Sequence, residues 1–303
     1  MRKCDIPEIA CASAVGDICG EGAVWHPGRA ALYWVDINRF LLHEYDPAAQ
    51  TTRTWHFTEP VTSANLTQDP ETLLLVFASR VGYWNPRKHP EVDTLYELRE
   101  VPAMRFNDAG VAPDGMLWVG TMANNVGANG EDKNVEFKGG VLYRIDARGG
   151  VTEWKRDIGI SNTVAWSPDS KSFYFGDTIA NVLYVYDYDR QSGTISRERT
   201  YLDRFERGVP DGSAMDAEGF LWNTRPGAGC IIRIAPDGHV DLTIQLQVSK
   251  PTTCAFGGAD LDTLYITSAR SAERLSGSLF AFKPGTRGIP AARFQRNGIA
   301  GAS

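Results

Sequence analysis

Six polar residues recur at one position of a repeated sequence pattern, and their types suit the binding of a cation. Each stands five or six residues before a turn between two short apolar segments, and together they are Glu21, Ser63, Asn107, Asn162, Asp211 and Thr252. The set holds two carboxylates, two carboxamides and two hydroxyls. Two carboxylates that converge on one point repel each other unless a cation or protons neutralise them, so we interpret the set as a candidate cation site.

The candidate ligands of this site are all oxygen atoms. Glu21, Asn162 and Asp211 offer carboxylate and amide oxygens, which are the ligands of hard divalent ions such as Ca²⁺, Mg²⁺ and Mn²⁺. Zn²⁺ or Fe²⁺, held by a carboxylate and water, fits the same residue types. The alternative is that Asn and Asp beside glycine are ordinary turn residues without a ligand. Six polar residues at one repeat position favour the cation site.

The repeated pattern consists of a strand, a turn and a second strand. Pro113, Asp114 and Gly115 lie between two short apolar segments and favour a hairpin, because proline presets φ and glycine adopts a positive φ. Comparable turns stand near residues 26, 69, 113, 168, 217 and 258, which are 41 to 55 residues apart. The strands that follow these turns are rich in aromatic and aliphatic residues: Ala31–Val35, Leu73–Phe77, Met116–Val119, Phe173–Phe175, Phe220–Trp222 and Leu264–Ile266.

Most units continue with a third strand and a weaker fourth strand. Third strands with their following turns are predicted at Leu42–Pro47, Val141–Asp146, Leu183–Asp187, Ile231–Gly238 and Ser278–Phe282. Fourth strands are predicted at Thr52–Phe57, Thr152–Arg156, Glu198–Leu202 and Thr243–Leu246. Four short strands in every ~40–50 residues, repeated six times, predict an all-β fold, a six-bladed β-propeller with four-stranded antiparallel blades around a central channel. We expect one domain over residues 1–303.

The first strand of each blade of a propeller lines the channel, so we expect the six polar residues to form a ring at one mouth. A strand near Ala10–Val15 is expected to close the last blade. The longest spacing between turns contains a polar insert, Asn124–Lys138. We predict that this insert is a lid or rim over the channel mouth, because long loops in compact repeats are usually functional.

The composition disfavours several classes of protein. The net charge of −6 argues against nucleic acid and anionic membranes as partners. The N-terminus has no continuous apolar segment behind its basic residues, so we expect no signal peptide and no membrane span. We expect a cytoplasmic protein, a monomer or a weak dimer, whose cysteines are reduced thiols outside any CxxC motif. These cysteines are Cys4, Cys11, Cys19, Cys230 and Cys254.

Other catalytic chemistries lack their motifs. The five histidines show no HxH or HExxH spacing, which disfavours a histidine zinc site. The sequence contains no G-x-S-x-G, so it gives no signal for a serine nucleophile. Trp25, Trp118, Trp166 and Trp222 recur in the blades, and we expect them to pack between blades.

Several motifs along the chain resemble those of the SMP-30/gluconolactonase/regucalcin family. In order, these motifs are Gly20–Trp25, Arg105–Asp108, Gly120–Met122, Ser161–Asn162, Pro210–Gly212 and Cys254–Gly258. The resemblance extends from about residue 17 to residue 283. It implies a six-bladed propeller with one divalent metal ion, which hydrolyses a sugar lactone to the aldonic acid in carbohydrate catabolism.

The resemblance also implies roles for individual residues. The metal ligands of the family correspond to Glu21, Asn162 and Asp211, and Asp211 matches the catalytic base. Asp177 matches a channel-facing aspartate, and its position equally suits a turn residue. The full set of candidate substrate-binding residues is Arg105, Asn107, Met122, Asn125 and Asp177.

Two positions depart from the pattern of the family. Animal members have a substrate-binding glutamate just after Gly-Thr-Met-Ala, where this chain has Asn124 and Asn125. This difference leaves the preferred sugar open. The usual Pro-Asn-Gly is replaced by Ser161, Asn162 and Thr163, which keeps the metal ligand and changes its backbone setting.

Two other functions are compatible with the same residues. The metal could serve the hydrolysis of phosphotriesters or aryl esters, or a propeller could bind calcium or a protein partner without catalysis. A purely binding module has no need of Arg105 and Asn107 beside the carboxylates. We therefore predict a lactonase.

Overall fold

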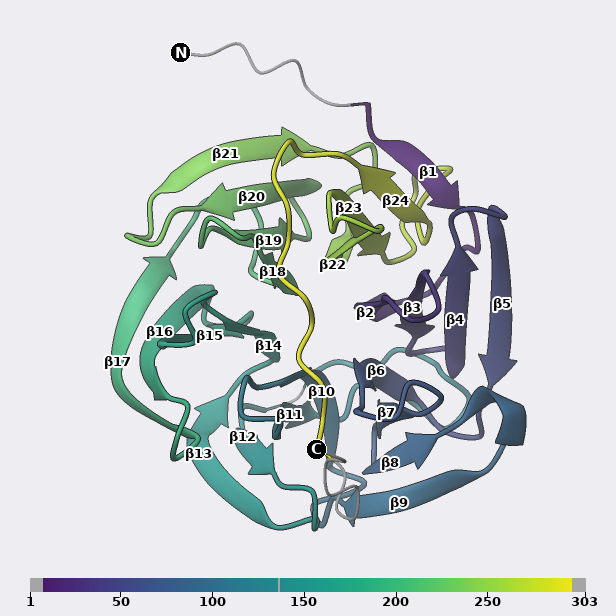
Figure 1. The fold of residues 1–303 in the computed structure, drawn as a ribbon, viewed down its shortest axis with the longest axis vertical. Coiled ribbons are helices and arrows are strands. Elements are labelled where there is room, and N and C mark those ends of the chain that lie inside the picture. The colour runs from purple at the N-terminus through teal and green to yellow at the C-terminus, as the bar shows by residue number, and fades with distance from the viewer. Residues whose placement is uncertain (1–7, 136, 296–303) are drawn as a thin grey trace, which may run out of the picture.

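The repeated strand pattern folds into six four-stranded antiparallel sheets, which surround a central channel as the blades of a propeller (Figure 1). The computed structural model describes residues 8–135 and 137–295. Within these residues the regular secondary structure consists of β-strands joined by turns and loops, and the only helix is a short 3₁₀ turn at Pro86–Lys88. The predicted all-β, six-bladed propeller is confirmed.

The first three blades follow one another along the chain, and each runs from the channel outward. The first contains β2 (Gly20–His26), β3 (Ala31–Asp36), β4 (Leu41–Asp46) and β5 (Thr51–His56). The second contains β6 (Val61–Leu66), β7 (Leu73–Phe77), β8 (Arg80–Trp84) and β9 (Val92–Glu97). The third contains β10 (Met104–Val111), β11 (Leu117–Ala123), β12 (Gly140–Ile145) and β13 (Val151–Ile158).

The last three blades repeat this order and close the ring. The fourth contains β14 (Ser161–Trp166), β15 (Ser172–Asp177), β16 (Val182–Asp189) and β17 (Thr194–Asp203). The fifth contains β18 (Ser213–Met215), β19 (Leu221–Arg225), β20 (Cys230–Ile234) and β21 (Val240–Gln245). The sixth contains β22 (Pro251–Gly257), β23 (Thr263–Ser268), β24 (Leu279–Phe282) and, as its outer strand, β1 (Ala10–Ser13). Because β1 pairs antiparallel with β24, the expected closure by an N-terminal strand is confirmed.

The segment that follows the last blade crosses the channel. Residues 287–295, which we call the strap, run over the face that carries the turns between first and second strands (Figure 1). The strap pairs with Asp216 of the fifth blade through Gly288, and with Thr67 of the second blade through Phe294. It also donates backbone hydrogen bonds to the turns of the sixth and third blades, from Gly288 to Leu261 and from Gln295 to Gly115. The strap therefore ties blades on opposite sides of the channel together.

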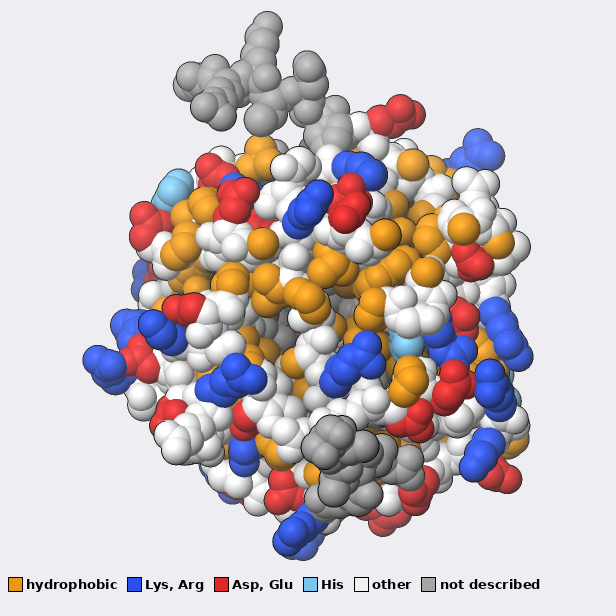
Figure 2. All heavy atoms as spheres, in the orientation of Figure 1, with side chains coloured by type: hydrophobic (Ala, Val, Ile, Leu, Met, Phe, Trp, Pro, Cys, Tyr) orange, Lys and Arg blue, Asp and Glu red, His pale blue; other side chains and the backbone are white. Residues whose placement is uncertain are grey.

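A wide cavity of about 1160 Å³ lies beneath the strap. Inner strands and the strap form its walls, which are mostly apolar, and Asp108 is the one acid among its described lining residues. Apolar side chains also gather around the centre of this face of the molecule (Figure 2). This end of the channel thus differs in character from the end that carries the acidic ring residues.

The burial of a strand follows its place in the blade. β3, β7 and β11 are buried at every residue, because neighbouring blades cover both faces of these second strands. In the outermost strand β5, by contrast, only Trp55 is fully buried. A strand covered on one face has a weaker apolar signal, which explains why the fourth strands are faint in the sequence. The outer strand β9 has the same weak apolar signal, and the sequence did not predict it. The neighbouring strand β8 was also not predicted.

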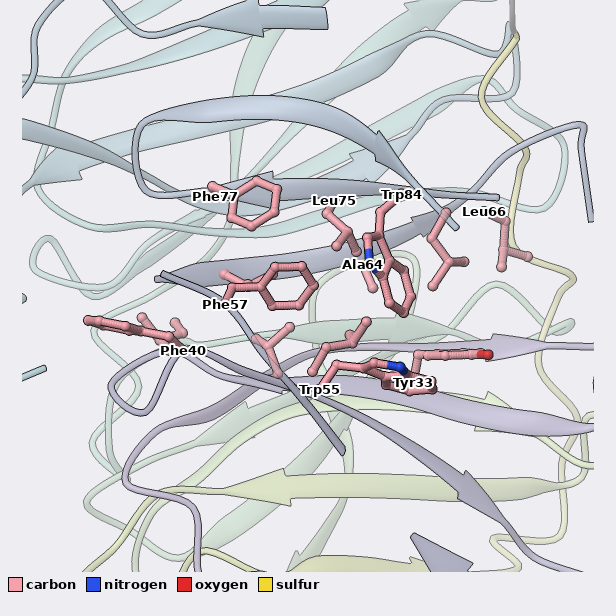
Figure 3. Close-up of a cluster of buried hydrophobic side chains, with 14 of the residues drawn as sticks. Tyr33, Phe40, Trp55, Phe57, Ala64, Leu66, Leu75, Phe77 and Trp84 are labelled. Carbon is pink, nitrogen blue, oxygen red and sulfur yellow. The ribbon is translucent and has the colours of Figure 1, made fainter. Parts of the chain in front are cut away.

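Aromatic and aliphatic side chains fill the space between neighbouring blades. Figure 3 shows this packing for the first two blades, where Trp55 and Phe57 lie against Phe77 and Trp84. Trp55 and Phe57 meet the ring of Trp84 edge to face, with ring centroids 5.1 and 5.8 Å away. This geometry adds to the free energy gained from apolar burial. The expected packing role is confirmed for Trp25, Trp118, Trp166 and Trp222, none of which is more than 7% exposed.

The described cysteines are free thiols, as expected: Cys11, Cys19, Cys230 and Cys254. Cys4 lies outside the described residues, as do residues 1–7 as a whole, on which the expectation of no signal peptide rests. In the part of the chain that the structure describes, no helix is long and apolar enough to cross a membrane.

The first prediction concerns the anchor of the strap. Phe294 is fully buried and packs near Tyr83, with ring centroids 6.2 Å apart. Truncation of a buried phenylalanine to alanine costs about 3–5 kcal/mol, because it removes apolar contacts and leaves a cavity. We expect Phe294→Ala to lower the free energy of unfolding by about 3 kcal/mol in chemical denaturation.

Phe137→Ala is the matched control for this experiment, because Phe137 is 46% exposed. Its effect should stay within about 0.5 kcal/mol. Equal stability of the two variants would mean that the strap does not contribute to holding the blades.

Candidate metal and substrate site

The six innermost strands bring the polar ring residues to one mouth of the channel. Each inner strand contacts the next around the whole circle, from β2 through β6, β10, β14 and β18 to β22, which contacts β2 again. Asn107 Nδ2 donates to Asn162 Oδ1 at 3.1 Å. Thr252 Oγ1 donates to the carbonyl oxygen of Gly20 in the neighbouring blade. The repeat position seen in the sequence is therefore a set of neighbouring positions in space.

Irregular strand register helps to aim the ring residues into the channel. Five of the six inner strands have a register shift at or beside the ring position. A β-bulge bends its strand and redirects a side chain. The shifts lie between Glu21 and Val24, Val61 and Ser63, Phe106 and Ala109, Asn162 and Val164, and Pro251 and Cys254.

Two glycines allow neighbouring inner strands to approach closely at the acidic ring residues. Gly22 follows Glu21 and has a φ of +58°, and a Cβ on it would lie 2.5 Å from the Cα of Ser63. Gly212 follows Asp211, and a Cβ on it would lie 2.0 Å from Oγ1 of Thr253. Only glycine fits such distances, so both acids stand where the backbones of adjacent blades come very close.

Glu21 and Asp211 form a pair of carboxyl groups that share a side-chain hydrogen bond. Burial raises the pKa of Glu21, and the negative charge of Asp108 raises it further. Burial also raises the pKa of Asp211 well above its usual value, and the charge of Glu21 adds to this effect. The pair therefore keeps a proton at neutral pH unless a cation takes its place.

Asp108 is a third acid near the pair, and the sequence analysis gave it no role. Burial raises the pKa of Asp108 to about 7, while hydrogen bonds from the backbone amides of Ala109, Thr163 and Val164 lower it. The bond from the amide of Ala109 to Oδ1 is 2.9 Å long. Since Thr163 and Val164 belong to the next blade, Asp108 joins the third and fourth blades beneath the ring.

The donor set of the ring fits a hard divalent cation. Glu21, Asn162 and Asp211 present oxygen only, and a cation between the two acids removes the repulsion that otherwise requires a proton. No three His, Cys, Asp or Glu side chains among the described residues form a metal-binding cluster, so such an ion depends on the amide oxygen of Asn162 as its third protein ligand. Asn162 Nδ2 donates to Thr178 Oγ1 at 2.8 Å, which fixes the orientation of the amide.

Arg105 provides a buried positive charge next to these acids. Its side chain is 4% exposed, and burial lowers its pKa to about 10, so it stays protonated at neutral pH. Arg105 Nε donates to Asn125 Oδ1 at 2.9 Å, and Nη1 donates to Asn107 Oδ1 at 2.7 Å. Three of the predicted substrate residues thus form one hydrogen-bonded chain, which ends at Asn162.

A small cavity of about 310 Å³ opens at this mouth and is lined by Arg105 and Asn125. Its volume lies at the lower end of the range for small-molecule pockets. The remaining lining residues come from the first blade, the insert and the sixth blade: Ile18, Cys19, Ile37, Asn38, Asp132, Lys250, Ala269 and Arg270. The cavity is thus built from segments distant in the sequence.

Three of the predicted substrate residues, Asn107, Met122 and Asp177, do not line this cavity. Met122 is 1% exposed and lies opposite Arg105 in the pairing of β10 with β11. Asp177 has both carboxylate oxygens occupied by backbone amides. The donors are the nitrogens of Gly159, Ile160, Ile179 and Ala180. The contacts of Asp177 are those of a turn residue, which is the alternative that the sequence left open.

The insert forms part of the rim of the small cavity, and the structure describes it except for residue 136. Asn38 of the first blade holds it, because Asn38 Nδ2 donates to the carbonyl of Gly130 and to Asp132 Oδ1, both at 2.8 Å. Val126 is buried in the apolar cluster of the first two blades. One side of the insert is therefore anchored in the core, while Asn125 and Asp132 face the cavity.

Thr163 stands where the resembling family has glycine, and its backbone is strained accordingly. Its φ is +57°, a region that β-branched residues rarely adopt. Thr163 Oγ1 donates to the carbonyl oxygen of Asp211 at 2.6 Å and lies 2.9 Å from Ser213 Oγ. The threonine thus makes a contact to the backbone of Asp211 that glycine cannot make, and this contact offsets the strain.

Asn223 and Arg225 also hold Asp211, and the sequence analysis missed both. Asn223 Nδ2 donates to the carbonyl oxygen of Asp211 at 3.0 Å, and Arg225 Nη1 donates to Asn223 Oδ1 at 3.2 Å. Arg225 is 1% exposed and also donates to the carbonyls of Arg207 and Gly208, in the loop that leads to Asp211. The available signal was the polar run that ends the strand Leu221–Arg225.

Comparison with known proteins places these features in a family. The profile described as "SMP-30/Gluconolactonase/LRE-like region" matches residues 19–270. The chain belongs to this family. The resemblance predicted from the six motifs is therefore confirmed.

Relatives within the SMP-30/gluconolactonase/LRE-like family include proteins named as lactonases. Pentonolactonase XacC of Haloferax volcanii is 34% identical over 252 residues, which cover 82% of this chain and 81% of that protein. The 6-deoxy-6-sulfogluconolactonase of Pseudomonas putida is 36% identical over 290 residues, which cover 90% and 94%. A solved structure of a calcium-binding protein, regucalcin, from Agrobacterium tumefaciens superposes with a TM-score of 0.87 at 26% identity, over 95% of this chain and 97% of that chain.

The second prediction concerns the support of Asp211. Arg225→Met removes the hydrogen bonds that connect Asn223 and the loop at 207–208, so the carboxylate of Asp211 should lose its exact placement. A misplacement of about 1 Å can cost about 100-fold in rate. We expect kcat for lactone hydrolysis, the activity implied by the family, to fall by about 10- to 100-fold at saturating metal, with a smaller change in KM.

Arg207→Met is the matched control, because Arg207 lies in the same loop and its side chain is exposed. Thermal unfolding of both variants should be measured in parallel, so that loss of the fold is recognised. Equal kcat values for the two variants would contradict the positioning role of Arg225.

Proposed function

We propose that this protein hydrolyses a sugar lactone to the corresponding aldonic acid, with one divalent metal ion held by Glu21, Asn162 and Asp211. The observation that carries the proposal is the connection of this oxygen-donor set to the buried Arg105. Asn107 is bonded to both Asn162 and Arg105, and Arg105 lines a small cavity together with Asn125. The names of the relatives, a pentonolactonase and a sulfogluconolactonase among them, support the same reaction.

The proposed reaction divides the work between the two acids and the cation. A bound divalent ion supplies Lewis acidity, which polarises the lactone carbonyl and stabilises the charge that develops on its oxygen. Asp211 accepts the proton of the attacking water, and its carboxylate is free to do so once a cation, rather than a proton, balances the charge of the pair. The product is an anion, so the nearby carboxylates favour its release.

Arg105 orients the substrate in this proposal. Its guanidinium is a planar fork with five N–H donors, which suits paired oxygen atoms on a sugar ring. Asn125 and Asn107 occupy Nε and Nη1, and Nη2 has no hydrogen bond within the described residues. Nη2 is therefore available to a hydroxyl or ring oxygen of the lactone.

A calcium-binding role without catalysis explains the oxygen donors and leaves Arg105 unexplained. Burial of an arginine without a carboxylate partner is costly, and Arg105 forms no ion pair within the described residues. A hydrogen bond from Arg105 to a substrate oxygen would account for the burial of this cation. The catabolic pathway, the cytoplasmic location and the monomeric or weakly dimeric state stay predictions from the sequence.

The third prediction separates the two roles of Asp211. Asp211→Asn keeps an oxygen for the cation and cannot accept a proton from water at neutral pH. We expect it to bind metal at high metal concentration and to lose kcat by about 10²–10⁴, the range for a missing general base. The measurements are the metal content of the purified protein and kcat on an aldonolactone panel in a pH-indicator assay.

Asn162→Ala is the comparison for this experiment, because it removes a ligand and leaves the base in place. We expect weaker metal binding, with kcat largely restored by added metal. Full rescue of Asp211→Asn by metal would show that Asp211 is only a ligand. The absence of hydrolysis of any lactone by the metal-loaded wild-type protein would contradict the proposed function itself.

The fourth prediction concerns the insert as a rim over the substrate. Asn38→Ala removes the two hydrogen bonds that hold the insert to the first blade, so Asn125 and Asp132 should become mobile. We expect KM for the preferred lactone to rise by about 3- to 10-fold, with a smaller change in kcat. An unchanged KM across the lactone panel would count against a role of the insert in binding.

A further inference from the structure

The small cavity is lined by a second repeat position, which lies two residues before the ring position in the chain. In the first, third and sixth blades, the residue two positions before the ring residue lines the cavity, and these residues are Cys19, Arg105 and Lys250. Residues two apart in an extended chain point to the same side and lie about 6–7 Å apart. The charged ring residues are acids, whereas both charged residues of this next layer are cations.

Lys250 and Arg270 stand side by side at the edge of the sixth blade. Lys250 precedes β22 and Arg270 follows β23, and the amide of Ala269 donates to the carbonyl of Lys250 at 2.9 Å. The guanidinium of Arg270 is held in place, because its Nη2 donates to the carbonyl of Gly16 at 3.0 Å. Both side chains line the same cavity as Arg105.

The charges of Lys250 and Arg270 are unbalanced by neighbouring acids. Neither side chain forms an ion pair with another described residue, although 18 such contacts occur elsewhere in the described chain. The cavity lining contains three cations and a single acid, Asp132, on the insert. One oxygen of Asp132 already accepts the hydrogen bond from Asn38. The part of the cavity away from the acidic ring is therefore positively charged.

We propose that Lys250 and Arg270 form a subsite for an anionic substituent of the substrate, on the end of the sugar lactone that is farthest from the lactone carbonyl. This inference rests on the proposed function, since it takes the lactone carbonyl to lie at the ring. The distance of about 6–7 Å between the ring and the next layer suits the length of a six-carbon sugar derivative. The substituent is a carboxylate, a sulfonate or a phosphate, each of which forms charge-assisted hydrogen bonds with Lys and Arg.

The separation of charges in the site supports this assignment. A neutral sugar uses the donors of Arg105, Asn107 and Asn125 and gains nothing from two further cations at the rim. An anionic substituent gains from both cations and, at the same time, keeps its charge away from Glu21 and Asp211. The site would therefore discriminate between anionic and neutral lactones by contacts far from the reacting bond.

The test compares lactones that differ at one position. Glucono-1,5-lactone is the neutral substrate, and its analogues with a 6-phosphate, a 6-sulfonate or a carboxylate at C6 are the three anionic substrates. We expect the metal-loaded wild-type protein to have a kcat/KM for at least one anionic lactone about tenfold or more above that for the neutral lactone, because a charged hydrogen bond contributes roughly this factor. The ranking of the three analogues identifies the substituent.

Lys250→Gln and Arg270→Gln should each lower the ratio of anionic to neutral kcat/KM by about tenfold. Raising the salt concentration should lower the same ratio in the wild-type protein, because both cations are at the rim. Lys171→Gln is the matched control, since Lys171 lies in the turn between β14 and β15 at the other end of the channel and is exposed. It should leave the ratio unchanged.

The outcomes distinguish the two proposals. Hydrolysis of the neutral lactone with no preference for any anionic analogue, or an unchanged ratio in both Gln variants, would overturn the subsite and leave the lactonase proposal standing. If no lactone is hydrolysed, calorimetric titration with glucarate and gluconate decides the subsite separately. Tighter binding of glucarate that is lost in Lys250→Gln supports the subsite, and equal binding overturns it.

Discussion

Packing between neighbouring blades is the interaction on which the rest of this structure depends. The second strands are buried on both faces because each blade lies between two others, and β1 completes the sixth blade beside the first. Glu21 and Asp211 are distant in the sequence, and they meet only because six blades close into a ring. The geometry of the site is thus set by apolar burial outside it, which leaves the ring positions free to carry polar residues.

The charges of the site are arranged in layers along the channel. Three acids lie at and below the ring, and burial raises the pKa of each of them. Arg105 follows above the ring, and the rim of the sixth blade carries two further cations. Each layer balances the charge of the next only in part, and the proposed cation and anion sites rest on this separation of charge.

The two ends of the channel differ in size and in the residues that line them. The mouth with the ring has a small cavity lined by charged, polar and apolar residues, whereas the opposite end is wide, mostly apolar and crossed by the strap. The strap joins blades across the channel and buries Phe294, which fits a structural role. The backbone of Asp211, the candidate base, is held through its carbonyl by hydrogen bonds from Thr163 and Asn223.

The sequence by itself determined the fold and the position in each repeat at which the candidate site residues lie. Second strands are covered on both faces and therefore have strong apolar runs, and the turns between strands contain characteristic residue types. The number of repeats equals the number of blades, so both the propeller and the ring positions were predictable. Arg105, Asn107 and Asn125 were predicted from the resemblance to the family, and the structure connects them. The outer strand β9 was missed because only one of its faces meets the core.

Only the tertiary structure decided how residues from different blades combine. Asn223 and Arg225 support Asp211 through side-chain contacts that have no regular spacing in the chain. Asp177 matches a site residue in sequence, yet four backbone amides occupy its oxygens. In the sequence Lys250 and Arg270 have no feature that separates them from other surface residues. In the folded ring they line the same cavity as Arg105. Local sequence encodes strands and turns, whereas contacts between blades depend on the closure of the whole ring.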